Sequence, residues 1–329
     1  MFKLAGLKKF ILKKTISTLI TLFAVITINF IIFRVMPGNP VHMMFTDPRV
    51  SKENIDVMMK RFGLDKPLWM QYFIYVRELF IGNLGISFWK NVPVIDVILG
   101  RLPQTIILLS FAILLSTVAG VFLGAYAAWK RGSKIDASIL TVSLVTYSVP
   151  SFWVGILLLI TFSYWLGLFP LGGITTPGIA SAPLLDQIID YLWHMALPLI
   201  TLFFYYTGGY VLIMRNAMLD VLGEDYITTA YAKGLKETVI MRKHAMRNAL
   251  LPVATITALN IGWMIAGVVE VEVVFAWPGL GKLMYDAIMQ RDYPLLQGVF
   301  LFIAISVILA NFLADVIYGY LDPRVREEK

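Results

Sequence analysis

Long stretches without a charged residue constrain this sequence more than any other feature. The run Ile16–Phe33 contains eighteen residues with no charge, and Thr105–Trp129 is a second run of this kind. A helix of about 20 apolar residues, rising 1.5 Å per residue, crosses a hydrocarbon layer about 30 Å thick. Charged residues make up 15% of the chain, against about 25% in an average soluble domain. The sequence therefore predicts an all-α, polytopic membrane protein.

Six membrane spans are predicted, separated by segments rich in proline, glycine and charge. One membrane domain, residues 15–329, would contain them. An interfacial helix at residues 1–14 would precede it, with Leu4, Leu7 and Ile11 on one face and Lys9 and Lys13 nearly opposite. A cleaved signal peptide is the weaker alternative, because its apolar core would be shorter than the first run and no Ala-x-Ala site follows. The predicted spans are residues 15–35, 104–128, 138–165, 195–214, 253–275 and 296–319.

Lysine and arginine are unevenly distributed between the predicted loops. If both termini are cytoplasmic, the inner segments carry seventeen of these residues and the longer outer segments carry ten. Short cytoplasmic loops are enriched in Lys and Arg, so both termini are predicted to lie in the cytoplasm. The net charge of +7 is interpreted as an orientation signal and as attraction to anionic membrane lipid, not as a sign of nucleic-acid binding.

The sequence lacks the residues that catalysis or metal binding would need. It has no cysteine and only three histidines, so neither a catalytic residue nor a metal site is predicted. Gly279-Leu-Gly-Lys282 imitates the end of a phosphate-binding loop. However, Ala276 stands where that loop has its first glycine, and Leu283 where it needs a hydroxyl group. No ATP site is therefore predicted in this chain.

The third predicted span contains the segment Ser148-Val-Pro-Ser-Phe-Trp153. Pro150 removes a backbone hydrogen bond and is predicted to kink the helix. The polar and aromatic side chains around it either line a polar path through the membrane or are satisfied within the helix bundle, and both interpretations stay open. The candidate path residues are Tyr147, Ser148, Ser151 and Trp153.

The small residues and the ionisable residues of the predicted spans indicate how the helices pack and which class of transporter is disfavoured. Gly120 and Gly124 are spaced for close helix packing, either within the subunit or at a moving subunit interface, and Gly262, Ala266 and Gly267 are similar. Ion-coupled carriers usually place ionisable groups near mid-membrane, and such groups are sparse here, which argues against that class. The few that occur lie towards span ends: Glu270, Glu272, Asp315 and the predicted interfacial residue His194.

The longest inner segment, residues 215–252, is predicted to be ordered. A helix from Asp220 to Lys233 would end at Gly234 in a left-handed cap. A second helix would run from Glu237 to Asn248, and Pro252 would begin the fifth span. The residues alone leave two interpretations open: a basic hairpin on the membrane surface, or a docking element for a soluble partner.

Five segments, in order along the chain, resemble one family. Thr228-Thr-Ala-Tyr-Ala-Lys-Gly234 resembles the Glu-Ala-Ala-xxx-Gly motif of permease subunits in binding-protein-dependent ABC importers. The set is most similar to the first of the two permeases in dipeptide and oligopeptide importers. The other four segments are Phe33-Arg-Val-Met-Pro-Gly-Asn-Pro40, Leu166-Gly-Leu-Phe-Pro170, Trp277-Pro-Gly-Leu-Gly281 with Arg291-Asp-Tyr-Pro294, and Tyr320-Leu-Asp-Pro-Arg324.

The resemblance implies a type I ABC importer permease in the plasma membrane of a prokaryote. Segment 215–252 would then be the coupling segment, docked on an ATPase subunit. Thr228 and Thr229 replace the family's Glu and first Ala, so a contact that needs the carboxylate is not carried over. The docking residues implied are Asp225, Tyr226, Thr228, Thr229, Ala230 and Gly234.

The resemblance also implies partners. These are a second homologous permease, two ATPase subunits that bind ATP and Mg²⁺, and an external solute-binding protein. The outer segment 36–103 and the loop 277–294 would face the binding protein, although a self-packed cap explains segment 36–103 equally well. The cargo implied is peptide, with oligosaccharides and nickel complexes as further options. An ion-coupled carrier or channel is the main alternative function, and a membrane anchor for signalling proteins is the third.

Overall fold

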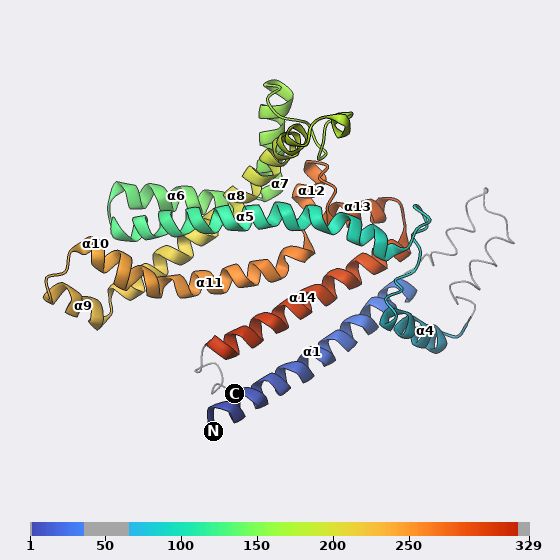
Figure 1. The fold of residues 1–329 in the computed structure, drawn as a ribbon, viewed down its shortest axis with the longest axis horizontal. Helices are drawn as coiled ribbons and strands as arrows, with labels where there is room; N and C mark the ends of the chain where they lie inside the picture. Colours follow the sequence, from blue (N-terminus) through green and yellow to red (C-terminus); the bar gives the residue numbers. More distant parts are fainter. Residues whose placement is uncertain (1, 36–65, 322–329) are drawn as a thin grey trace. The chain divides into compact units, whose positions relative to one another are not determined.

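The computed structural model describes residues 2–35 and 66–321, with side chains from 10 to 34 and from 66 to 316. Within these ranges every regular element is a helix (Figure 1). The chain divides into two compact units, Met1–Pro103 with Leu283–Lys329, and Gln104–Lys282. Parts of the resemblance motifs, Met36–Pro40 and Asp322–Arg324, lie outside the described residues.

An antiparallel helix pair forms the core of the first unit. Helix α1, Phe2–Val35, lies beside α14, Tyr293–Leu321 (Figure 1). Near one end of the pair Lys14 Nζ donates a hydrogen bond to Asp315 Oδ2 at 2.7 Å. Near the other, Asn29 Nδ2 lies 3.4 Å from the Gln297 carbonyl oxygen. Helix α1 is continuous through residue 14, so the predicted interfacial helix is not a separate element.

A short helix and a tight turn accompany this pair. Helix α4, Leu68–Phe80, contacts α1, and the turn is closed by a β-bridge between Ile86 and Pro93. Asp292 accepts hydrogen bonds from the backbone N–H groups of Phe88 and Trp89 at 3.1 Å each. It also accepts one from Leu295 N at 3.2 Å, which caps the first turn of α14. One buried carboxylate thus holds the turn and starts the last span.

The second unit is a bundle of helices. Gly120 and Gly124 allow α5 and α8 to pack closely: a Cβ on Gly124 would lie 2.7 Å from the Val211 carbonyl oxygen. This contact explains the pair as packing within the subunit. In chain order, the α-helices that lie wholly or largely in the second unit are α5 Val94–Trp129, α6 Lys134–Ser148, α7 Ser151–Leu158, α8 Leu184–Leu222, α9 Asp225–Ala232, α10 Glu237–Val239, α11 Met246–Trp263 and α12 Val269–Val274. Helix α13, Leu280–Met289, belongs mostly to the first unit.

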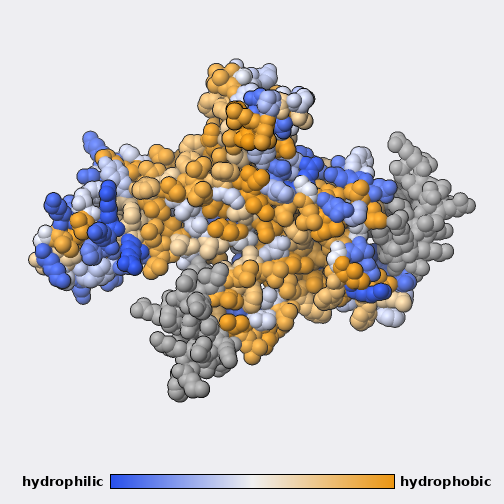
Figure 2. Space-filling model, viewed as in Figure 1, coloured by the Kyte–Doolittle hydropathy of each residue, from blue (hydrophilic) through white to orange (hydrophobic). Residues whose placement is uncertain are grey.

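Five helices in the described part are long and apolar enough to cross a membrane, and the bent pair α6 and α7 makes a sixth if counted as one span. Figure 2 shows apolar side chains over the long helices and hydrophilic ones around α9 and α10. Together with the helical content, this confirms the predicted all-α membrane fold.

Two of the predicted spans differ at both ends from the helices that contain them. Helix α8 extends well beyond 195–214 at both ends. The fifth span begins at Glu237, not at Pro252, because a π-helical turn, Ile240–Ala245, joins α10 to α11 and the helix continues through the proline. It ends at Ala266, not 275, because Gly267 adopts a φ of +73° that ends the helix.

Candidate functional site

The best-defined candidate site is helix α9 with the elements that support it. The sequence predicted one helix from Asp220 to Lys233, but two are present: α8 ends at Leu222 and α9 begins at Asp225. Gly223 and Glu224 form the break, and Glu224 is extended, with ψ 146°. Gly234 has a φ of +72°, which confirms the predicted left-handed position after the helix.

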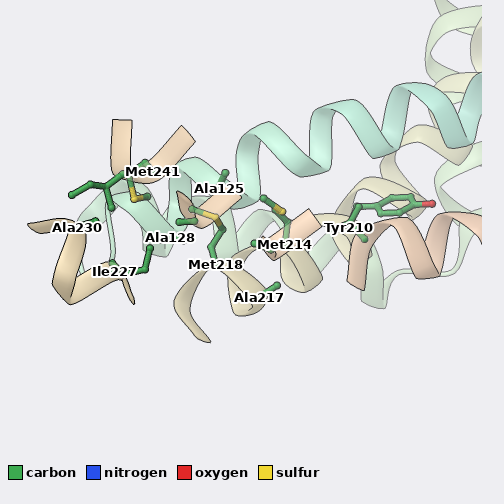
Figure 3. Close-up of a cluster of buried hydrophobic side chains, with 13 residues drawn as sticks. Ala125, Ala128, Tyr210, Met214, Ala217, Met218, Ile227, Ala230 and Met241 are labelled. Atoms are coloured by element: carbon green, nitrogen blue, oxygen red, sulfur yellow. The ribbon is translucent and has the colours of Figure 1, made fainter. Parts of the chain in front are cut away.

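The inner face of α9 is anchored in a buried apolar cluster. Ile227 and Ala230, three residues apart and therefore on one face, are 1% and 5% exposed. Figure 3 shows them beside side chains of α5, α8 and the π-helical turn. The cluster contains Ala125, Ala128, Tyr210, Met214, Ala217, Met218, Ile240, Met241, Ala245, Ala249 and Val253. Because interiors are close-packed, α9 is fixed to α5, α8, the π-helical turn and α11.

The outer face of α9 is free for contact with another molecule. Five of the six predicted docking residues are exposed on it, and the sixth, Ala230, is buried and so supports the helix from beneath. Tyr231 and Leu235 are also exposed, at 48% and 39%, and sequence reasoning missed both. The helical period could have found Tyr231, which falls one turn after Thr228. The exposed predicted residues are Asp225, Tyr226, Thr228, Thr229 and Gly234.

Polar contacts tie the base of this site to neighbouring helices. Arg215 on α8 donates from Nε to Asp136 Oδ1 at 2.7 Å and from Nη2 to Oδ2 at 2.9 Å. Asp136, in the first turn of α6, also accepts from Gly132 N at 2.9 Å. The Tyr226 hydroxyl accepts from Asn248 Nδ2 at 2.6 Å. These bonds join α6, α8, α9 and α11 at one end of the second unit.

The third span is broken rather than merely kinked. Val149 is extended, with ψ 131°, as expected for a residue before proline, and α6 and α7 meet at 96°. Of the four candidate path residues, Tyr147, Ser148 and Trp153 are exposed. Ser151 is buried, and its Oγ donates to Glu270 Oε2 at 3.1 Å. Glu270 lies on α12, outside the fifth span in which the sequence placed it.

The loop that imitates a phosphate-binding motif surrounds a carboxylate of its own chain. Glu272 is 1% exposed and accepts from Thr105 Oγ1 at 2.8 Å and from Lys282 N at 2.9 Å. Gly279 and Gly281 lie so close that a Cβ on either would clash with neighbouring atoms, among them the Glu272 carboxylate. Burial raises the pKa of Glu272, and the hydrogen bonds to its carboxylate oppose this shift. Gly279-Leu-Gly-Lys282 is thus a packing element.

His194, predicted to be an interfacial residue, is buried in α8. Its Nδ1 lies 2.8 Å from the Asp190 carbonyl oxygen, one turn earlier in the helix. The Asp190 carboxylate accepts from Thr176 N at 2.8 Å and from Thr176 Oγ1 at 2.6 Å. The sequence did not reveal these contacts, because burial of a single polar residue in a helix leaves no periodic signal. The pair Asp190 and Thr176 fixes the loop before α8 to that helix.

Comparison with protein families finds two matches that together span most of the chain. A family model described as "Binding-protein-dependent transport system inner membrane component" matches residues 120–327. A second, which describes the N-terminal part of the membrane component of such systems, matches residues 7–109. The first match contains α9 and the broken third span.

Curated relatives align over almost their entire length. The chain is 40% identical to a di/tripeptide transport system permease protein of Pseudomonas aeruginosa, over 94% of this chain and 96% of that protein. It is 36% identical to an oligopeptide transport system permease protein of Bacillus subtilis, over 96% and 98%. It is also 36% identical to the dipeptide transport system permease protein of Escherichia coli, over 98% and 99%.

Proposed function

The chain belongs to the family of binding-protein-dependent transport system inner membrane components, and from this premise we propose that it is the membrane permease subunit of an ATP-driven peptide importer. The relatives in Pseudomonas, Bacillus and Escherichia are named as di/tripeptide, oligopeptide and dipeptide permeases, which supports peptide over oligosaccharide or nickel-complex cargo. An ion-coupled carrier, the main alternative from the sequence, finds no support among them.

The proposal rests on the contrast between the two faces of α9. Its inner face is fixed in a buried cluster, and its outer face presents polar and aromatic side chains. A short helix built in this way transmits a displacement to α5, α8 and α11 when a partner moves it. In the proposed complex the partner is an ATPase subunit that binds ATP and Mg²⁺, and the coupling between ATP hydrolysis and transport is reciprocal.

The proposed path for the cargo lies along the break of the third span. Non-helical backbone at membrane depth is tolerated where it is buried in protein or lines a water-filled cavity. The exposed side chains of Tyr147, Ser148 and Trp153 offer such a lining, and a second, homologous permease would supply the other half. Alternating access between the two permeases then moves the peptide delivered by an external binding protein.

The docking proposal is tested with Thr228→Arg, which adds a large cation to the exposed face of α9. We expect this variant to insert normally and to lose co-purification of the ATPase subunits from gently solubilised native membranes. The matched control is Thr175→Arg, an exposed threonine on the loop before α8, which should keep them. Full recovery of the ATPases with Thr228→Arg would contradict docking through α9.

The transport proposal is tested separately in vesicles reconstituted with the whole complex. Uptake of a labelled dipeptide should require ATP and the external binding protein, and should persist when ionophores remove all ion gradients. Uptake that follows an ion gradient and ignores ATP would contradict the proposal.

A further inference from the structure

The first unit contains a cavity of about 630 Å³ that the proposed transport function does not use. It is lined by α4, by the turn that the bridge Ile86 to Pro93 closes, and by adjacent ends of α1 and α14. Its volume lies within the range of about 300–1,000 Å³ that is typical of small-ligand sites. Polar side chains in its lining include Arg34, Tyr75 and Gln297.

Two buried donors in this cavity lack acceptors. Among the described residues, neither Arg34 Nε nor Gln297 Nε2 has a hydrogen-bond partner of ordinary length and angle, although the Gln297 side chain lies near the Tyr75 hydroxyl. The Arg34 guanidinium lies 5.6 Å from the centre of the Phe30 ring, and the described side chains form no salt bridge with it. An unsatisfied buried donor costs about 1–3 kcal/mol, and more when it is charged. Because both groups are donors, the ligand that would satisfy them carries acceptor oxygens.

The other charged residues in the described part of the lining leave a positive surplus. Among these described residues Glu78 is the one carboxylate, and its Oε2 already accepts from Asn83 Nδ2 at 2.9 Å. Lys66 adds a second cation beside Arg34. An arginine fork matches the geometry of phosphate oxygens and can donate two parallel hydrogen bonds to them. The chemistry of the cavity therefore fits a phosphate-bearing anion.

The depth of the cavity in the membrane points to the source of that anion. The Tyr72 hydroxyl lies 2.8 Å from Thr27 Oγ1, and the Tyr75 hydroxyl accepts from Asn29 Nδ2 at 2.9 Å. Thr27 precedes Val35, the last residue of α1, by about 12 Å along the helix. Helix α4 therefore lies beside the last turns of the first span, close to the level of the lipid headgroups.

The exposed face of α4 carries large aromatic side chains, which are typical of the level of the lipid headgroups. Trp69, Phe73 and Phe80 are 64%, 67% and 85% exposed, and their spacing places them on one side of the helix. Aromatic residues are enriched at the boundary between hydrocarbon and headgroups. The cavity thus lies behind an apolar helix face suited to contact with acyl chains.

We propose that this cavity binds the phosphate group of an anionic headgroup, held by Arg34 and Gln297, in the leaflet opposite the N-terminus of α1. The ligand is a phosphodiester or phosphomonoester, supplied by a phospholipid or by a soluble metabolite. Binding there fixes α4 to α1 and α14 and does not depend on the transported solute.

The test measures binding of phosphatidylglycerol to the purified full-length complex by native mass spectrometry, beside titrations with glycerol 3-phosphate and inorganic phosphate. Arg34→Gln should weaken binding about tenfold, the effect of losing a charged hydrogen-bond pair. Gln297→Leu should weaken it by less. The matched control is Arg77→Gln, which removes an exposed cation of α4 outside the cavity and should leave binding unchanged.

The outcomes separate the two sources. Binding of phosphatidylglycerol alone identifies a lipid site, and equal binding of glycerol 3-phosphate identifies a headgroup site open to soluble anions. If Arg34→Gln fails to fold, as judged by size-exclusion chromatography, Gln297→Leu decides by itself. The proposal is overturned if no phosphate compound binds the wild type, or if the cavity variants bind as tightly as Arg77→Gln.

Discussion

Arg215 and Asp136 show how much one ion pair can contribute at the edge of a membrane bundle. Both hydrogen bonds of the pair are short, and Asp136 is 4% exposed. Removing one partner of a buried pair leaves an uncompensated charge, which costs about 3–5 kcal/mol. The pair lies where α6 meets α8, close to the apolar cluster that anchors α9. Its loss should therefore lower both the stability of the protein and the proposed coupling of transport to the ATPase.

We expect Arg215→Ala to lower the free energy of unfolding by about 3 kcal/mol. Denaturant unfolding in detergent micelles, followed by circular dichroism, measures the change. Arg131→Ala, an exposed cation near the same carboxylate, should change it by less than about 1 kcal/mol. Equal losses in the two variants would show that the paired geometry contributes nothing.

Glu272 makes stability depend on pH. Burial raises its pKa above the ordinary value of 4.5, so the folded protein holds the proton more tightly than the unfolded chain. The unfolding free energy should therefore be highest below pH 4.5 and fall as pH rises through the folded-state pKa. Thermal unfolding of Glu272→Gln between pH 4 and 8 should lose this slope, while Glu270→Gln, at an exposed site, should retain it.

At the scale of elements, the buried and exposed faces of α9 predict opposite effects for neighbouring substitutions. Ala230→Arg forces a charge into the apolar cluster, so we expect α9 to detach and the segment 223–236 to become sensitive to protease. Thr229→Arg adds the same charge one residue earlier, on the exposed face, and should remain resistant. Limited proteolysis of the inserted proteins distinguishes the two, and equal sensitivity would contradict the packing seen in Figure 3.

Patterns in the sequence were sufficient to predict some elements and not others. The long apolar runs predicted α1, α5 and α14, because uncharged runs of this length are typical of membrane-spanning helices. Gly234 predicted the end of α9, since only a left-handed turn requires glycine there. The break before α9 was missed because Gly223 and Glu224 carry a weak signal. The end of the fifth span was missed because residues 268–275 are apolar apart from two glutamates, and only their tertiary contacts show that they form a separate helix.

The exposed face of α9 was predicted only in part for a similar reason. The motif Thr228 to Gly234 located the helix, but a motif does not state which side chains face the bundle. Ala230 was predicted to be a docking residue, but its side chain is buried on the face of α9 that packs against the bundle. Tyr231 and Leu235 reach the surface because Ile227 and Ala230 set the rotation of α9.

At the scale of the whole molecule, the absence of cysteine from the sequence allows the proposed orientation to be tested directly. Thr229→Cys should react with a membrane-impermeant maleimide only after the cells are permeabilised, because α9 is proposed to face the cytoplasm. Asn91→Cys, on the turn beside Asp292, should react in intact spheroplasts. The reverse pattern would place both termini outside and overturn the orientation derived from lysine and arginine counts.

Helix α8 has a further consequence for how the second unit moves. Its 39 residues run without a break, a length of about 58 Å. One end is fixed to the preceding loop through Asp190 and Thr176, and the other leads directly into α9. If the helix tilts as a rigid rod by about 5° around its α9 end, its far end is displaced by about 5 Å. A small rotation imposed at α9 by the proposed ATPase partner would thus become a displacement of about 5 Å at the far end of α8, which is comparable to the width of a peptide backbone.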